Sequence, residues 1–118
     1  MSDIIISDRL ELILEAINLI EERIITIDTS NTTDKLTILD SLAMRLQQIG
    51  ENIKKINQQN ELFFEEQLLV DVDPIIRFRD FIAHHYEKTD FEIVLDICKD
   101  HIPKLKIKIV SYLNEKKK

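Results

Sequence analysis

The chain has 118 residues, a net charge of −6 and a sequence pI near 5.0. This length predicts a single domain over residues 1–118 that can bury a core without a metal ion or a disulfide. The acidic balance excludes a broad basic surface for nucleic acid, so any RNA contact must be local. Residues 103–118 are rich in lysine, which favours a frayed helix end and leaves a strip that contacts an RNA backbone as the alternative.

The sequence also predicts the compartment. The single cysteine, Cys98, excludes an internal disulfide and is typical of a buried thiol in a reducing compartment. The N-terminus has no basic region and only three consecutive apolar residues, unlike a signal peptide. No apolar run approaches the ~20 residues of a membrane span. We therefore expect a cytoplasmic protein that makes no membrane contact.

One glycine and two prolines, with abundant Leu, Ile, Glu and Lys, indicate an all-α protein. The first helix is predicted to start near Ser7, as N-cap, and to end near Ile27. The segment DTSNTTD separates it from a second helix over residues 34–58, capped by Thr33 or Asp34. Apolar residues at helical spacing form the expected buried stripes of the two helices: Leu10, Ile13, Leu14, Ile17, Ile20 and Ile24, then Leu39, Leu42, Leu46, Ile49, Ile53 and Ile56.

Gly50 lies in the middle of the second predicted helix, where a glycine costs about 1 kcal/mol relative to alanine. The close approach of another backbone is the simplest reason for a glycine there, and a kink is the alternative.

The second half of the chain predicts three more helices. A short helix is expected over residues 61–67, and the next runs from Pro74 to His85 or Glu87 with Asp73 as its N-cap. Thr89 or Asp90 caps a last helix, which Pro103 is expected to kink. Four long helices and one short helix predict an antiparallel bundle. The inward residues expected on the last helix are Phe91, Val94, Leu95, Cys98, Ile102, Leu105, Ile109 and Leu113.

The segment RFRDFIAHHYEKTD, residues 77–90, concentrates polar side chains on the fourth predicted helix, whose apolar contacts are expected from Ile75, Ile76, Phe78, Phe81 and Ile82. Asp80 and His84 are about 40° apart around an ideal helix and can hydrogen-bond. Arg79 and His84 are about 140° apart and do not converge on one ideal helix. Their convergence requires a helix end, a long arginine reaching across or a second copy of the chain, of which a symmetric dimer is the simplest.

An arginine and a histidine near a shared phosphate suit phosphodiester cleavage. The histidine can move a proton at the attacking or leaving oxygen, and the arginine can hold the phosphate and its developing charge. RNA supplies its own nucleophile, the 2′-hydroxyl, so this chemistry needs no metal. On spacing alone, however, Arg-x4-His is common by chance, and a polar helix face is the simpler interpretation.

Three segments together resemble one family, the HepT-like toxins of the HEPN superfamily. IIRFRDFIAHHYEKTD resembles its signature, in which an apolar lead-in precedes Arg, a polar residue, three variable positions, His, one residue and Tyr. LQQIGENIKKI, residues 46–56, is similar to the family's IGEA-x-K segment, and VLDICKDHIPKLKIKI, residues 94–109, resembles its last helix. Three segments in the right order are far more specific than the short motif.

The resemblance implies the toxin of a prokaryotic type II, or type VII-like, toxin-antitoxin system that acts as a metal-independent endoribonuclease in a homodimer, with no cofactor. It implies that Arg79 and His84 are catalytic and that Asp80 is their polar helper. The usual partner of the family is a minimal nucleotidyltransferase antitoxin. The resemblance implies that this partner modifies Tyr86 with adenylyl groups and so inhibits the nuclease.

A second interpretation is a non-catalytic helical adaptor that binds a nucleotidyltransferase. The acidic pI favours it, as does Asp80, where the family commonly has asparagine. Cys98 and His101 could share a metal ion with another histidine, but no second short-spaced ligand pair is present. We therefore expect no metal site.

Overall fold

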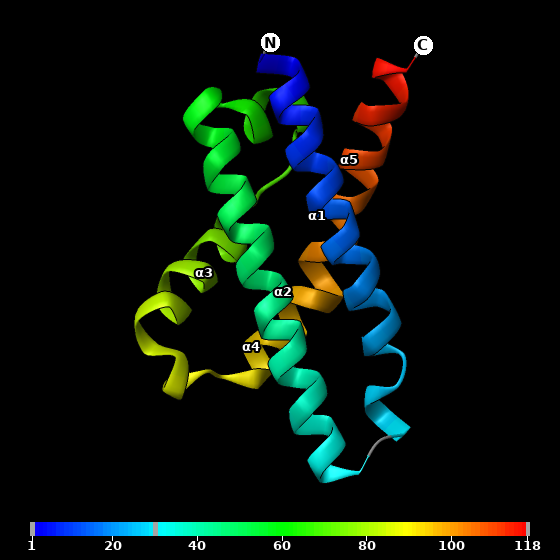
Figure 1. The fold of residues 1–118 in the computed structure, drawn as a ribbon, viewed down its shortest axis with the longest axis vertical. Helices are drawn as coiled ribbons and strands as arrows, with labels where there is room; N and C mark the ends of the chain where they lie inside the picture. Colours follow the sequence, from blue (N-terminus) through cyan, green and yellow to red (C-terminus); the bar gives the residue numbers. More distant parts are fainter. Residues whose placement is uncertain (1, 30, 118) are drawn as a thin grey trace.

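The computed structural model describes residues 2–29 and 31–117, and these residues form helices and no strand, which confirms the all-α prediction. Figure 1 shows two long antiparallel helices, α1 (Ser2–Ile24) and α2 (Thr32–Gln59), side by side along the molecule. Helix α3 (Asp73–His85) packs on α2, on the side away from α1. Helix α4 (Phe91–Asp96) also contacts α2, and α5 (Ile102–Lys116) packs against α1.

Four short helical segments connect these helices. Two are 3₁₀ turns, η1 (Ile27–Thr29) and η3 (Tyr86–Lys88), and two are π-helical, η2 (Phe63–Leu68) and η4 (Ile97–His101). Segment η2 takes the place of the short helix expected over residues 61–67. It ends at Leu68, and the next residue, Leu69, has a left-handed backbone (φ 56°) and caps the segment by donating its N–H to the Phe64 carbonyl.

The predicted apolar stripes form the core between the helices. Every residue expected inward on α2 is buried except Leu39, which is partly buried, and Leu14, Ile24, Phe91 and Leu95 are also only partly buried. None of the helices in the described ranges combines the length and the apolar character that a membrane span requires.

The predicted boundaries of the first helix are wrong at both ends. Helix α1 begins at Ser2 and ends at Ile24, so Ser7 lies inside the helix and is not its N-cap. The reason is packing: Ile6, before the expected cap, is buried in the core and extends the helix backwards. Ile27 remains buried, but in the 3₁₀ turn η1.

The predicted caps of α2 and α3 also need correction. Asn31 caps α2, because its side-chain oxygen accepts a hydrogen bond of 2.8 Å from the Asp34 N–H. Asp73 and Pro74 do open α3, but the carboxylate that accepts there belongs to Asp71, which binds the Asp73 N–H at 2.9 Å. Several short polar residues stand before each helix, and the backbone path decides which of them can reach an exposed N–H.

The last predicted helix is one helical run with a π segment inside it. Asp90 caps α4, as expected, by accepting a hydrogen bond from the Glu92 N–H at 2.9 Å. The π segment η4 lies before Pro103, which occupies the first turn of α5. Proline has no N–H to donate and its ring crowds the carbonyl four residues earlier, so the wider π turn relieves that contact.

Candidate active site on helix α3

Arg79 is held against α2 by the only glycine of the chain. A Cβ atom built on Gly50 would lie 2.5 Å from Cβ and 2.9 Å from Cγ of Arg79, and 3.4 Å from the Ile75 carbonyl oxygen. Position 50 therefore tolerates no side chain unless α3 moves away. The close approach expected at Gly50 is present, and it fixes the stem of the arginine predicted to be catalytic.

The Arg79 guanidinium lies among charged groups of α2 and α3. Its Nη1 is 3.3 Å from Oδ1 of Asp80, and its Nη2 is 4.0 Å from Oε1 of Glu51. Its Nε is buried and has no hydrogen-bond partner among the described residues. An unpaired buried donor costs roughly 1–3 kcal/mol, so packing, and not a full set of hydrogen bonds, sets the position of Arg79.

Asp80 is paired with Lys54 on α2. The Lys54 ammonium donates to Oδ1 of Asp80 at 2.9 Å, and this is the same oxygen that Arg79 approaches. The hydrogen bond from Lys54 lowers the pKa of Asp80 below its ordinary value of 3.8, and Arg79 lowers it further. Asp80 is therefore a carboxylate at neutral pH.

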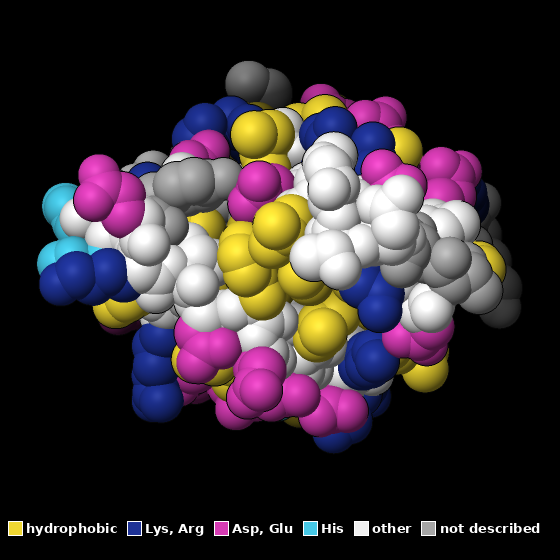
Figure 2. Space-filling view, turned by 90° about the horizontal axis from the view of Figure 1, so that it is seen from below, with side chains coloured by type: hydrophobic (Ala, Val, Ile, Leu, Met, Phe, Trp, Pro, Cys, Tyr) yellow, Lys and Arg dark blue, Asp and Glu magenta, His cyan; other side chains and the backbone are white. Residues whose placement is uncertain are grey.

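The hydrogen bond expected between Asp80 and His84 is not formed among the described residues, because Asp80 turns towards α2 and binds Lys54 and Arg79. His84 is exposed in the last turn of α3, and its ring lies 6.5 Å from that of His85. Figure 2 shows histidine side chains at the left edge of the molecule, on the side where α3 ends in Figure 1.

The helix end expected near His84 is present, since α3 ends at His85. Arg79 nevertheless contacts Glu51 and Asp80, and no hydrogen bond joins it to His84 within residues 31–117. Tyr86 begins the 3₁₀ turn η3 directly after α3, and its side chain lies outside the described part of the structure. One chain therefore presents the arginine and the histidine separately.

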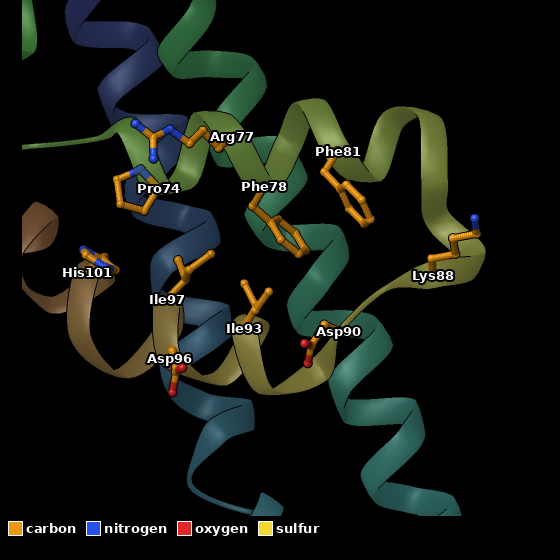
Figure 3. A pocket seen from close by; sticks show the side chains of 10 residues that line it. All are labelled: Pro74, Arg77, Phe78, Phe81, Lys88, Asp90, Ile93, Asp96, Ile97 and His101. Atoms are coloured by element: carbon orange, nitrogen blue, oxygen red, sulfur yellow. The ribbon is translucent and has the colours of Figure 1, made fainter.

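A groove of about 570 Å³ lies between α3 and α4, next to the end of α3 that carries His84. In Figure 3, Phe78 and Phe81 project from α3 towards Ile93 and Ile97. Phe81 was expected to supply apolar contacts, but the residue is 44% exposed, and Ile93 is 48% exposed. The ring of Phe81 also packs against that of His85, and the two ring centroids are 5.0 Å apart. The motif helix thus carries an exposed apolar face beside its histidines.

A metal site is not apparent in the described residues, where no three His, Cys, Asp or Glu side chains gather closely enough to hold an ion. Cys98 is buried, and burial raises the pKa of its thiol to about 12.

Sequence reasoning missed Glu51 and Lys54, which lie close to the motif in space. A signal was present, because both belong to the segment LQQIGENIKKI that resembles the family's IGEA-x-K pattern. The sequence did not place these residues beside Arg79, because helical spacing relates only residues of the same helix.

One comparison with known proteins identifies a family for this chain. The sequence profile of a family described as "Ribonuclease HepT-like" matches residues 13–111, which is most of the chain and includes Gly50, Arg79 and His84. Comparisons with curated proteins and with solved structures found no match.

Proposed function

Because the chain belongs to the HepT-like ribonuclease family, we propose that it is a metal-independent endoribonuclease and the toxin of a type II or type VII-like toxin-antitoxin system. The observation that carries the proposal is the placement of Arg79. Its stem is fixed against Gly50, and its Nε has no hydrogen-bond partner in the part of the chain that the structure describes. Its two Nη groups face the partly exposed carboxylates of Asp80 and Glu51. A purely structural arginine would be expected to satisfy more of its donors.

In the proposed reaction, His84 takes the proton of an RNA 2′-hydroxyl, and the 2′-oxygen attacks the adjacent phosphorus. The bond from phosphorus to the 5′-oxygen breaks, that oxygen takes a proton from protonated His84, and a 2′,3′-cyclic phosphate remains. Arg79 binds the non-bridging oxygens and stabilises the charge that develops on them. Asp80, the neighbour of Arg79 on α3, is the polar helper of this pair.

The proposal includes a homodimer, because Arg79 and His84 are about 140° apart around α3 and face different surroundings. A symmetric pair can place Arg79 of one copy beside His84 of the other. The exposed apolar face formed by Phe81 and Ile93 supports a protein contact beside the motif. A second copy is the occupant that would complete the site.

We further propose that a minimal nucleotidyltransferase antitoxin modifies Tyr86. Transfer of an adenylyl group from ATP to the tyrosine oxygen releases pyrophosphate and leaves a phosphodiester on the toxin. Tyr86 follows α3 directly, so this added negative charge would lie near the motif and compete with RNA for Arg79.

The test is RNA cleavage by the purified protein in EDTA. Wild-type protein is expected to produce 2′,3′-cyclic phosphate ends, and Arg79→Ala and His84→Ala are each expected to lose at least about 100-fold in rate. Arg77→Ala and His85→Ala are matched controls on the same helix, with exposed side chains, and are expected to cleave as wild type does. Cleavage that survives both motif substitutions would reject this site.

The second candidate function is a non-catalytic adaptor that binds a nucleotidyltransferase. It is favoured by the two carboxylates beside Arg79, since Asp80 and Glu51 occupy the side of the guanidinium that a phosphate would need. A stable complex with such an enzyme, without RNA cleavage or growth inhibition on expression, would establish the adaptor. Cleavage in EDTA that depends on His84 would exclude it.

A further inference from the structure

Two cations share one oxygen of Asp80. Lys54 Nζ lies 2.9 Å from Oδ1, and Arg79 Nη1 lies 3.3 Å from the same atom. The lysine therefore makes the closer contact, and it comes from α2, whereas Asp80 and Arg79 are neighbours on α3. Lys54 and Arg79 compete for the same carboxylate.

The charges around Arg79 are balanced only when Lys54 is counted. Lys54 and Arg79 are positive, and Asp80 and Glu51 are negative, so the four side chains sum to zero. Without the lysine, one guanidinium would face two carboxylates, with a local charge of −1. A phosphodiester is itself an anion, and it would be repelled there and would find the guanidinium already paired.

The pairs are weak enough for RNA to exchange with them. The side chains of Asp80 and Glu51, which Arg79 contacts, are 50% and 43% exposed, and exposed ion pairs change an equilibrium by about fivefold at most. A phosphate that makes two parallel hydrogen bonds to a guanidinium is a stronger partner than a single exposed carboxylate. The contacts of Arg79 in the free protein are therefore exchangeable.

We propose that Lys54 is a positioning residue, which holds the Asp80 carboxylate and thereby leaves the Arg79 guanidinium available to an RNA phosphodiester. The inference rests on the proposed function, which supplies RNA as the ligand. It adds Lys54 of α2 to the site. The hydrogen bond from Lys54 is also the main cause of the lowered pKa of Asp80, as expected of a dominant partner.

The test measures binding of a short, fluorescently labelled 2′-O-methyl RNA, which has no free 2′-hydroxyl and cannot be cleaved. Lys54→Met is expected to raise the dissociation constant by about fivefold, because it removes the partner of Asp80. Lys54→Arg keeps a cation in reach and is expected to bind as wild type does. Lys55→Met is the matched control, because it removes the same charge from the next position of α2, which lines a different surface with Arg9.

The decisive variant is the pair Lys54→Met with Asp80→Asn. The asparagine removes the competing negative charge, so the double variant is expected to regain the affinity that Lys54→Met loses. A lysine that touched RNA itself would leave that contact missing in the double variant, and a lysine that supplied only general positive charge would lose no more affinity than Lys55→Met does. Equal losses in Lys54→Met and Lys55→Met, or a double variant as weak as Lys54→Met, would overturn the proposal.

The two proposals fail in different ways. If wild-type protein binds the 2′-O-methyl RNA and the rescue is observed, but unmodified RNA is never cleaved, then the nuclease is rejected and the role of Lys54 is kept. If wild-type protein cleaves RNA and Lys54→Met binds as tightly as wild type, then only the role of Lys54 is rejected. A wild-type protein that neither binds the 2′-O-methyl RNA nor cleaves unmodified RNA would overturn both.

Discussion

Gly50 and Arg79 are in contact across α2 and α3, and a Cβ atom at position 50 would lie 2.5 Å from Cβ of Arg79. The atoms in the way belong to the base of the arginine side chain and to the Ile75 carbonyl, which cannot swing aside as a flexible tip could. This contact fixes the distance between α2 and α3 at the point where α3 carries Arg79.

We expect Gly50→Ala to lower the free energy of unfolding by about 1 kcal/mol, because overpacking costs about 2 kcal/mol and the better helix propensity of alanine offsets about 1. Urea denaturation followed by circular dichroism measures the change. Gln58→Ala, at an exposed position of the same helix, is the control and is expected to be neutral within about 0.5 kcal/mol. A Gly50→Ala protein more stable than wild type would show that the helices separate without cost.

Asp80 is expected to titrate at a higher pH when Lys54 is replaced by methionine. The pKa of Asp80 is lowered in the folded chain, so its pairing is fully present above the ordinary value of 3.8 and is lost as the pH falls through the lowered pKa. Carboxyl NMR titration of wild type and Lys54→Met measures both values. An unchanged Asp80 titration in the variant would mean that the contact at 2.9 Å is not maintained in solution.

Cys98 is expected to resist alkylation in the folded protein. Burial raises its pKa to about 12, so at pH 8 only about one thiol in ten thousand is ionised, and the thiolate is the reactive form. Iodoacetamide labelling followed by intact mass measures the reaction, and the same protein in urea is the positive control. Fast labelling without urea would show that the π segment η4, which holds Cys98, opens in the native state.

Phe81→Asp is expected to weaken the proposed homodimer by at least about tenfold, because burying a phenylalanine stabilises a contact by about 1.5–3 kcal/mol and a buried unpaired carboxylate opposes it. Light scattering over a range of protein concentrations measures the change. Ile107→Asp is the matched control, since Ile107 is an exposed apolar residue on α5, away from the motif. Equal effects of the two substitutions would place the dimer contact elsewhere.

The all-α class, the buried stripes and the position of the motif helix were predictable from composition and from apolar spacing. These signals are local, since a stripe at helical spacing needs only one helix to be recognised. Helix ends were less predictable. Ser7 resembles an N-cap, but burial of Ile6 in the core outweighs that preference.

The motif residues Arg79, Asp80, His84 and Tyr86 were named from their order along the chain and from a family resemblance, and they remain proposals as a site. The partners of Asp80 were not predictable in the same way. Its pairing with His84 was expected from the spacing on one helix, yet Asp80 turns to a lysine 26 positions away.

That contact exists because Gly50 lets α3 approach α2, so that Glu51, the next residue, and Lys54, one turn further on, reach the charged groups of α3. A helical period relates residues of one helix to each other, but the register between two helices depends on how their side chains pack. The sequence alone could therefore identify Arg79 as a candidate and suggest a close approach at Gly50. The tertiary packing decided which charges surround that arginine.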